Sequence, residues 1–419
     1  MCRRRPRPHS RSTFIGRLLL VLSSLGATAP TVRAGEPPAP VAVEPVFEVL
    51  EVEGRVSSGR LTSLAADRIG VAPADGPNRE IPLAALVKLS REDGRARAAE
   101  GADVVLPDGD RLVNVIIGPA TDAAVEVHSY ALGKMSVPLD AVLGLIMTPP
   151  TDAEELDRLW RRIRTEPRAS EVIWLGNGDR VAGTLLGIDD RAVRIQVQGK
   201  PMEIDRAGIT AIGFDPALLA YDRPKTPYLE ATLVDGSRLG IVDFKLEKGH
   251  VSALTRFGAS LRVPVADVVG LVARTTALDY LTERVVDGHS YVSYLGPVRP
   301  YRIDAAVDGR PFQLGGRRFE RGLGTQSRTL LAYKLKPGDL RFQALVGVDD
   351  RAGPLGSVVF RVMVDDQTRF TSPAMSARDA PRSIDVDLAG AKLLILITEF
   401  GERGDVRDLA DWIEPRIVR

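Results

Sequence analysis

Dipeptides that favour tight turns recur through the first half of the chain, each between two strand-like apolar runs. They stand at Asp108-Gly109, Asn177-Gly178 and Asp235-Gly236. Such dipeptides are the strongest local signal for a β-hairpin, because the turn positions require a positive φ that few residues tolerate. The first half of the chain is therefore constrained to fold mainly as short antiparallel strands.

Each turn belongs to a longer pattern of strand, turn, strand and closing apolar segment. From the turn glycine, the closing element follows after 29 residues at Pro138, 26 at Ile204 and 28 at Pro264. Several short strands in so small a unit suit an SH3-like barrel or a strongly bent sheet, because curling covers the strand edges. We expect three such β repeats after a degenerate first copy, over residues 46–92, 103–148, 171–215 and 228–274.

One segment, residues 151–168, has the period of a helix. Thr151 and Glu154 have capping-box spacing, and an apolar stripe with helical spacing follows them. We expect a connector helix docked on a barrel, with its arginines on a solvated face. The stripe comprises Leu156, Leu159, Trp160 and Ile163, and the arginines are Arg158, Arg161, Arg162 and Arg164.

The first 34 residues have the features of a secretory signal peptide. A basic stretch precedes the short apolar run 18–25, and small residues then precede a cleavage point after Ala34. A Pro-rich linker is expected over residues 35–45. The apolar run is shorter than the roughly 20 residues of a membrane span, so no transmembrane segment is expected. We expect a secreted or periplasmic protein.

Charge and cysteine content restrict the class of function. Residues 1–34 contain seven of the 56 basic residues and none of the 55 acidic ones, so the remainder has a formal charge of −6. Basic residues are interleaved with acids, which disfavours a nucleic-acid partner. The single cysteine, Cys2, lies within the expected signal peptide. Disulfides and cysteine metal sites are therefore not expected in the mature chain.

From His289 the pattern becomes strands of a different spacing, which predicts a β-sandwich over residues 289–419. In the segment VVFRVMVDD, Val358, Phe360, Val362 and Val364 fall on one face of a strand. Asp365-Asp366 then reads as a polar hairpin turn. The fold class expected for the whole chain is all-β.

Five ordered blocks in this region resemble the NPCBM family, named as carbohydrate-binding modules and found beside glycosidases. The blocks are FERGLGTQSRT, the Tyr333-x-Leu335 strand, RFQALVGVDD with GSVVFRVMVDD, IDVDLAGAKLLILI, and DLADW. The resemblance implies a galactose-binding-like jelly roll and a sugar ligand. Relatives usually carry His at two positions where this chain departs from the family pattern and has Gln326 and Leu409.

The doublet Asp349-Asp350 ends a strand and precedes the loop RAGPLG. Structural hydrogen bonds to loop N–H groups are one interpretation. A calcium site at Asp349 and Asp350 is a second. Recognition of sugar hydroxyls by Asp349, Asp350 or Arg351 is a third. A hydrolytic pair is disfavoured, because adjacent residues of a strand point to opposite sides, whereas glycosidase carboxylates face each other across a cleft.

Further candidate ligand-binding residues lie in the Gly-rich and terminal blocks. Arg321 and Gln326 flank glycines that would let a ligand approach the backbone. Trp412 would either stack on a sugar or fill the core, and we expect Asp408 and Asp411 to tie its strand to the Gly-rich segment. Three tyrosines are further candidates for an exposed rim of the binding surface: Tyr291, Tyr294 and Tyr301.

No nucleophile elbow, zinc-protease motif, P-loop or dinucleotide fingerprint occurs in the sequence. We therefore expect a secreted, non-catalytic carbohydrate-binding protein whose partner is a glycan or polysaccharide, with the repeats as spacer or assembly surface. No cofactor is expected beyond the calcium alternative. Two other hypotheses stay open: a structural or protein-binding component of the cell envelope, and a divergent polysaccharide hydrolase.

Overall fold

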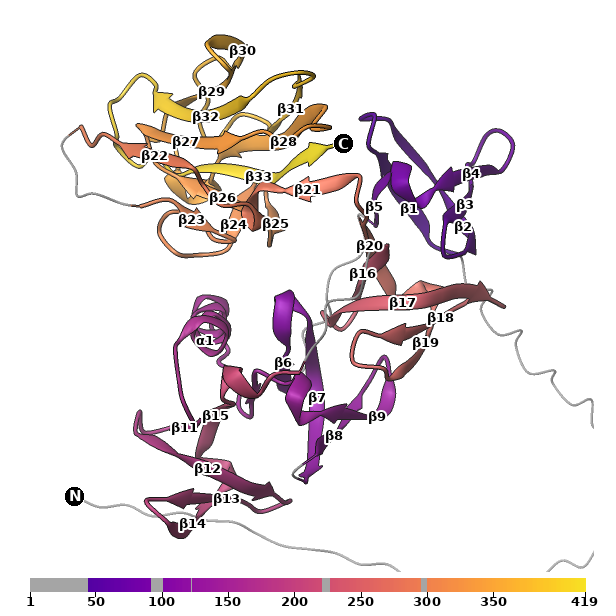
Figure 1. The fold of residues 1–419 in the computed structure, drawn as a ribbon, viewed down its shortest axis with the longest axis vertical. Coiled ribbons are helices and arrows are strands. Elements are labelled where there is room, and N and C mark those ends of the chain that lie inside the picture. Colours follow the sequence, from indigo (N-terminus) through magenta and orange to yellow (C-terminus); the bar gives the residue numbers. More distant parts are fainter. Residues whose placement is uncertain (1–43, 92–100, 122, 221–226, 295–299) are drawn as a thin grey trace, which may run out of the picture. The chain divides into compact units, whose positions relative to one another are not determined.

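The computed structural model describes residues 44–91, 101–121, 123–220, 227–294 and 300–419. Strands dominate this part of the chain, and the fold class is all-β as expected (Figure 1). The expected signal peptide and nearly all of the expected linker lie outside the described residues. No helix in the described ranges is long and apolar enough to cross a membrane.

Four consecutive segments of the described chain each form a unit of five strands. The first unit contains β1 (Val46–Glu51), β2 (Val56–Leu64), β3 (Arg68–Ala72), β4 (Arg79–Pro82) and β5 (Leu86–Ser90). The second contains β6 (Ala102–Val105), β7 (Arg111–Ala120), β8 (Ala124–Ser129), β9 (Gly133–Pro138) and β10 (Gly144–Ile146). The third contains β11 (Glu171–Leu175), β12 (Arg180–Ile188), β13 (Ala192–Val197), β14 (Lys200–Asp205) and β15 (Ile209–Gly213). The fourth contains β16 (Tyr228–Leu233), β17 (Arg238–Glu247), β18 (His250–Thr255), β19 (Ser260–Pro264) and β20 (Val268–Arg274).

All four units have the same strand connectivity. The first four strands form an antiparallel meander, and the fifth strand returns to pair with the first, as β5 does with β1. A single turn of 3-10 helix joins the fourth strand to the fifth in every unit. This return lets one face of a short sheet close on itself, and the buried residues of the units form a shared apolar core.

The fifth strands also join the units in pairs. β5 of the first unit pairs with β20 of the fourth, and β10 of the second pairs with β15 of the third. Both contacts are antiparallel, so strand edges that would be open in an isolated unit are covered by a neighbour. The register centres on Leu89 opposite Leu271 and on Leu145 opposite Ile212.

The turn glycines behave as the dipeptide signal predicts, but the residues before them differ. Asp108 and Gly109 both have positive φ, at 59° and 85°. At the other two turns the glycines Gly178 and Gly236 have a φ of 90°, whereas Asn177 and Asp235 do not enter the positive region. The prediction that both residues of each turn need positive φ was therefore wrong for two of the three.

The connector helix α1 spans Ala153–Thr165. Its cap is Asp152, whose side chain accepts hydrogen bonds from the backbone N–H of Glu154 and Glu155, so the expected Thr151 cap was wrong. The expected apolar stripe packs in a small cluster against Val172 and Trp174 of β11. Of the four arginines, Arg158, Arg162 and Arg164 are exposed and Arg161 is half-buried.

The C-terminal region is a β-sandwich that begins before the expected residue 289. Its strands are β21 (Leu278–Tyr280), β22 (Gly288–Tyr291), β23 (Arg302–Ile303), β24 (Phe312–Leu314), β25 (Arg317–Phe319), β26 (Gly322–Thr325), β27 (Thr329–Lys334), β28 (Arg341–Val348), β29 (Val358–Val364), β30 (Gln367–Thr371), β31 (Arg382–Asp387), β32 (Leu393–Phe400) and β33 (Ala410–Val418). One layer has the order β23-β26-β33-β28-β31, with β21 also paired to β33. The other has the order β22-β27-β32-β29-β30, and β24 and β25 form a separate hairpin.

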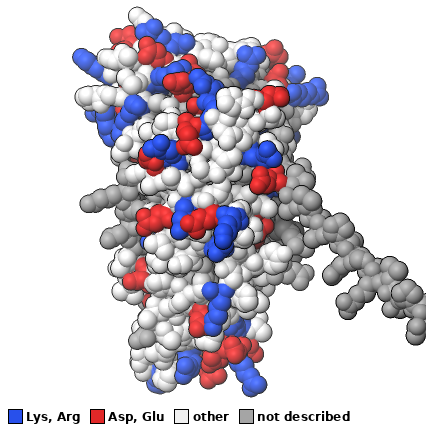
Figure 2. Space-filling model, turned by 90° about the vertical axis from the view of Figure 1, so that its right-hand side faces the viewer, with Lys and Arg blue, Asp and Glu red and all other residues white. Residues whose placement is uncertain are grey.

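The two layers enclose an apolar core. The face Val358, Phe360, Val362 and Val364 is buried as predicted, and Asp365 with Asp366 forms the turn between β29 and β30. On the face seen in Figure 2 the basic and acidic residues are interleaved rather than gathered in one basic patch.

Gly144 tests whether the paired fifth strands stabilise the units. A Cβ at this position would lie 2.6 Å from the backbone oxygen of Ile212 and 2.7 Å from the side chain of Ile163. We predict that Gly144→Ala lowers the free energy of unfolding by about 1–3 kcal/mol, because the added methyl forces the strands apart. Urea denaturation measures the change.

Gly208→Ala is the matched control, because a Cβ there meets nothing within 4 Å and its φ is not positive. Its stability should stay within about 0.5 kcal/mol of the parent. Equal stabilities of the two variants would contradict the close packing of β10 on β15.

Candidate functional site

The strand registers bring several loops to one end of the sandwich. In the first layer the end of β26 (Thr325), the start of β33 (Ala410) and the end of β28 (Val348) lie side by side. In the second layer Thr329 of β27 is level with Thr398 near the end of β32. The hydroxyl oxygens of Thr325 and Thr398 lie 2.8 Å apart and join the layers there. We call residues 292–294, 326–328, 349–357 and 399–409 the loop end.

Asp408 ties two of these loops together. Its carboxylate accepts a hydrogen bond from the hydroxyl of Ser327 and another, of 2.8 Å, from the backbone N–H of Ser357. The side chain is fully buried, and burial raises the pKa of Asp408 to about 6 although both hydrogen bonds lower it. The expected link between the terminal block and the Gly-rich segment is thus made by Asp408.

The first Asp doublet makes the structural hydrogen bonds that were one of its three interpretations. Asp349 is 0% exposed and accepts a hydrogen bond from the backbone N–H of Gln313. It also accepts hydrogen bonds from two guanidinium nitrogens of Arg351, at 2.6 and 2.7 Å. Asp350 accepts from the N–H groups of Gly315 and Gly316, both at 2.8 Å. The doublet therefore fastens the β24–β25 hairpin to the end of β28.

The calcium interpretation finds little support in these contacts. The carboxylate oxygens that would ligate a cation are engaged by Arg351 and by backbone N–H groups. Within the described ranges, no group of three or more His, Cys, Asp or Glu side chains is placed to hold a metal ion. Calcium at Asp349 and Asp350 remains a prediction, as does direct sugar contact by Asp349, Asp350 or Arg351.

Asp411 faces Asp349 inside the domain rather than the Gly-rich segment. It is 0% exposed, and its carboxyl oxygens have no donor among the described residues. Burial, followed by the charge of Asp349 and a hydrogen bond between the two carboxyl groups, raises the pKa of Asp411 well above its usual value. Because no described residue donates to the buried carboxyl group of Asp411, its neutral form is favoured over its charged form.

Trp412 belongs to the core. It is 0% exposed, its ring meets Phe360 edge to face at a centroid distance of 5.2 Å, and its Nε1–H donates to Thr398. Stacking on a sugar would require this ring to leave the interior of the domain, so of the two interpretations the structure places Trp412 in the packing one.

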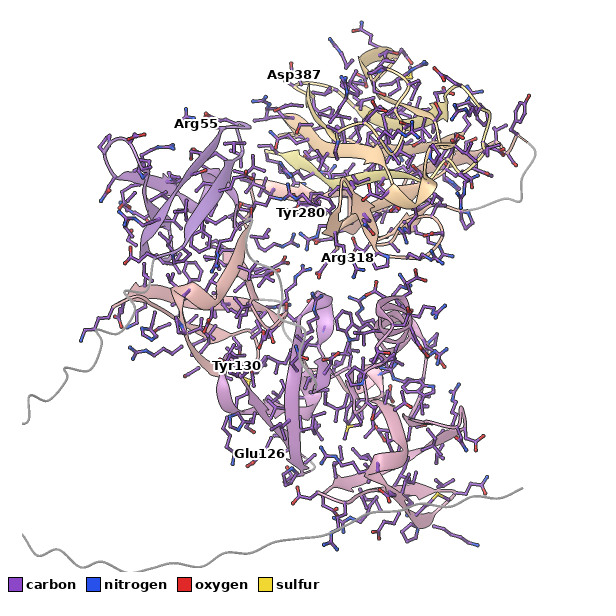
Figure 3. All side chains as sticks on the ribbon, turned by 180° about the vertical axis from the view of Figure 1, so that it is seen from behind. Arg55, Glu126, Tyr130, Tyr280, Arg318 and Asp387 are labelled. Atoms are coloured by element: carbon purple, nitrogen blue, oxygen red, sulfur yellow. The ribbon has the colours of Figure 1, made fainter. Side chains whose placement is uncertain are left out.

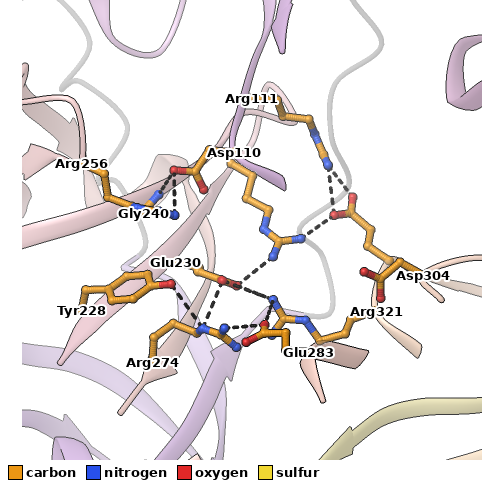
Figure 4. Close-up of polar contacts among 12 residues, drawn as sticks. Asp110, Arg111, Tyr228, Glu230, Gly240, Arg256, Arg274, Glu283, Asp304 and Arg321 are labelled. Atoms are coloured by element: carbon orange, nitrogen blue, oxygen red, sulfur yellow. Dashed lines mark hydrogen bonds and ion pairs between the residues drawn. The ribbon is translucent and has the colours of Figure 1, made fainter. Parts of the chain in front are cut away.

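The Gly-rich segment is a buried strand rather than a loop, and it separates Arg321 from Gln326. Gly324 in β26 has no room for a side chain, because a Cβ would lie 2.3 Å from the backbone oxygen of Ala305. Gln326 lies at the loop end, 7% exposed, and its Nε2 donates to the backbone oxygen of Asp405. Arg321 precedes the other end of β26 and pairs with Glu230 of the fourth unit (Figure 4). The glycines between Arg321 and Gln326 therefore lie in a buried strand, where a ligand could not approach their backbone as expected.

The exposed part of the loop end combines one of the candidate tyrosines with an ion pair that the sequence did not single out. Arg328 is about half exposed, and its Nε lies 3.1 Å from Glu399. Tyr294, one of the three rim tyrosines, is 63% exposed and meets Phe400 edge to face. Tyr291 and Tyr301 are half-buried. Arg328 and Glu399 lie 71 residues apart, so only the pairing of β27 with β32 could have revealed them.

The carboxyl pair of Asp349 and Asp411 gives a pH prediction. The folded state retains the Asp411 proton, whereas the unfolded chain loses it near pH 4. Stability from this group is complete below that pH and declines as pH rises toward the raised pKa. We predict that Asp411→Asn, whose amide can donate to Asp349, flattens the decline between pH 4 and 8. Urea denaturation across this range measures it.

Asp366→Asn serves as the control, because Asp366 is an exposed turn residue. Its pH profile should follow that of the parent protein. A profile of Asp411→Asn as steep as the parent's would contradict a raised pKa of Asp411.

Comparison with known proteins identifies this domain. A family model described as the NPCBM/NEW2 domain matches residues 285–418. A protein of Renibacterium salmoninarum, provisionally named an endo-alpha-N-acetylgalactosaminidase, is 31% identical over 126 residues, which are 29% of this chain and 8% of the relative. Alpha-1,3-galactosidase B of Akkermansia muciniphila is 27% identical over 117 residues, 27% of this chain and 15% of the relative.

Among solved structures, CBM51 from Clostridium perfringens GH95 in complex with methyl-galactose is 24% identical and aligns with a TM-score of 0.31. The alignment covers 34% of this chain and 99% of that structure. The chain spans only 8% and 15% of the lengths of these two curated relatives. Residues 285–418 of this chain are an NPCBM/NEW2 domain.

Proposed function

We propose that this chain is a secreted, non-catalytic protein that binds glycans at the loop end of its NPCBM/NEW2 domain. The observation that carries the proposal is the exposed ring of Tyr294 close to the Arg328–Glu399 ion pair. The two features are contiguous: Val292 and Arg328 exchange backbone hydrogen bonds, and Phe400 beneath Tyr294 follows Glu399 directly.

This combination suits a sugar. An exposed aromatic ring offers an apolar face for the C–H groups of a pyranose. A guanidinium supplies hydrogen-bond donors and a carboxylate supplies acceptors for neighbouring hydroxyls. Hydrogen bonds of Asp349, Asp350, Arg351 and Asp408 support the surface by holding neighbouring loops. In this proposal Gln326 and Trp412 also support the surface rather than contact the glycan.

A second candidate is a structural or protein-binding component of the cell envelope. It is favoured by Gln326 and Leu409, which occupy the two positions where the family usually carries His. A divergent polysaccharide hydrolase is the weakest candidate, because Asp349 and Asp411 are both fully buried and face each other directly instead of flanking a substrate.

Export is tested by the N-terminus of the mature protein. We predict cleavage after Ala34 when the full chain is expressed in a secreting bacterial host, because small residues precede that position. Mass spectrometry of the exported protein should find Gly35 as its first residue. Retention of Met1 on a cytoplasmic product would contradict secretion.

Glycan binding is tested with the full chain on an array of immobilised glycans, followed by calorimetry with any sugar retained. We predict that Tyr294→Ala weakens binding about tenfold or more, as the loss of an aromatic anchor does. Arg328→Ala should weaken it as well, because it removes hydrogen-bond donors.

Tyr130→Ala is the matched control. Tyr130 is 76% exposed in the turn between β8 and β9 of the second unit (Figure 3). Binding that survives Tyr294→Ala would contradict this site. Absence of any signal on the array, together with capture of an envelope protein by the chain, would favour the second candidate.

A further inference from the structure

The NPCBM/NEW2 domain contacts the fourth unit through a buried carboxylate that meets three arginines (Figure 4). Glu230 of β16 has a side chain only 5% exposed. Its oxygens lie 2.8 Å from Arg238, 3.3 Å from Arg274 and 3.2 Å from Arg321. Arg238 and Arg274 belong to the same unit, whereas Arg321 belongs to the NPCBM/NEW2 domain. We call these four residues the Glu230 cluster.

The cluster extends on both sides of the contact. Glu320, next to Arg321 in the chain, pairs with Arg111 of the second unit and with Arg238, the latter at 3.0 Å. The guanidinium of Arg321 also lies over the ring of Tyr280 at 4.2 Å. Arg274 pairs in addition with Glu283. Each arginine of the cluster thus has a second partner that fixes its geometry.

Charge strongly favours the ionised form of Glu230. Burial alone would raise its pKa, but the charges of Arg238, Arg321 and Arg274 outweigh burial and hold it at about 2. Because this folded pKa is lowered, the contribution of Glu230 to stability is present above about pH 4 and is lost only as pH falls toward 2. Neutralising the side chain would leave three guanidinium groups facing one another, and breaking a buried pair in this way is strongly destabilising.

Other contacts join the NPCBM/NEW2 domain to the first unit. Lys88 of β5 pairs with Glu414 of β33 at 3.0 Å, and the side chain of Gln343 donates to the backbone oxygen of Val52 at 2.7 Å. Val87, Leu278 and Val418 form an apolar cluster beside them. The domain is therefore held by several units at once, over both polar and apolar contacts.

We infer that the Glu230 cluster is a latch that couples the NPCBM/NEW2 domain to the fourth unit, so that the two open as one cooperative body. The units are then more than the spacer expected from the sequence. The inference does not depend on glycan binding, since it concerns contacts at the end of β26 remote from the loop end.

Hydrogen exchange of the full chain, read by mass spectrometry, tests the latch. With Glu230→Gln, peptides from β16 and β20 should exchange about tenfold faster or more, and peptides from β26 and β33 of the NPCBM/NEW2 domain should accelerate with them. Peptides from β12 to β14 of the third unit should not change. Arg321→Met makes the reciprocal test, because a change in the NPCBM/NEW2 domain should then loosen β16.

The matched control is Glu126→Gln, which removes an exposed ion pair with Lys134 on the second unit (Figure 3) and should leave all peptides unchanged. Acceleration confined to the fourth unit in Glu230→Gln, or to β26 and β33 in Arg321→Met, would overturn the inference. If circular dichroism shows that Glu230→Gln does not fold, Arg321→Met alone decides, because its side chain is similar in length and retains packing on Tyr280.

Discussion

The central position of β33 is the constraint on which the C-terminal domain depends. This strand pairs with β21, β26 and β28, and eight of its nine residues are buried. Alternate side chains therefore have to satisfy different surroundings. Trp412 fills the space between the layers, Asp411 is fully buried with a raised pKa, and Glu414 reaches Lys88 of the first unit. One strand thereby links the core, the loop end and the contact with the units.

The four-residue strand β26 separates the loop end of the domain from the Glu230 cluster. Beyond its last residue, Thr325, the loops are fastened by Asp408 and present Tyr294 and Arg328 to solvent. Before its first residue, Gly322, Arg321 enters the Glu230 cluster. Glycines at 322 and 324 are needed because neighbouring backbone lies within 2.6 Å of any added Cβ. The Glu230 cluster thus lies at one end of β26, and the loop end at the other end of this strand stays exposed.

Four acids near the loop end have structural roles, although their sequence positions are typical of binding residues. Asp349, Asp350, Asp408 and Asp411 are acidic, close to glycines and at strand ends, as binding residues often are. Asp349 and Asp350 accept hydrogen bonds from backbone N–H groups of the β24–β25 hairpin, and Asp408 accepts one from the N–H of Ser357. A loop of irregular backbone needs such acceptors as much as a ligand does, because buried N–H groups must be paired.

Local patterns predicted the fold well wherever one segment supplied the whole signal. The alternation in Val358–Val364 and the stripe in α1 were correct because neighbours along the chain fix which face is buried. The cap of α1 was displaced by one residue, since Thr151 and Asp152 are both good caps and only backbone geometry chooses between them. The turn conformations at Asn177 and Asp235 were also predicted wrongly, because backbone geometry rather than residue type sets the φ of these residues.

Local sequence patterns were enough to predict that the chain is all-β, where most strands lie, and that residues 289–419 resemble the NPCBM family, because strand period, turn glycines and ordered motifs are local. Contacts between side chains that are far apart in the sequence could be identified only from the tertiary structure. The Glu230–Arg321 pair joins residues 91 positions apart, and the Arg328–Glu399 pair depends on the register of β27 against β32. Such contacts arise from the packing of whole strands, so no short window of sequence contains them.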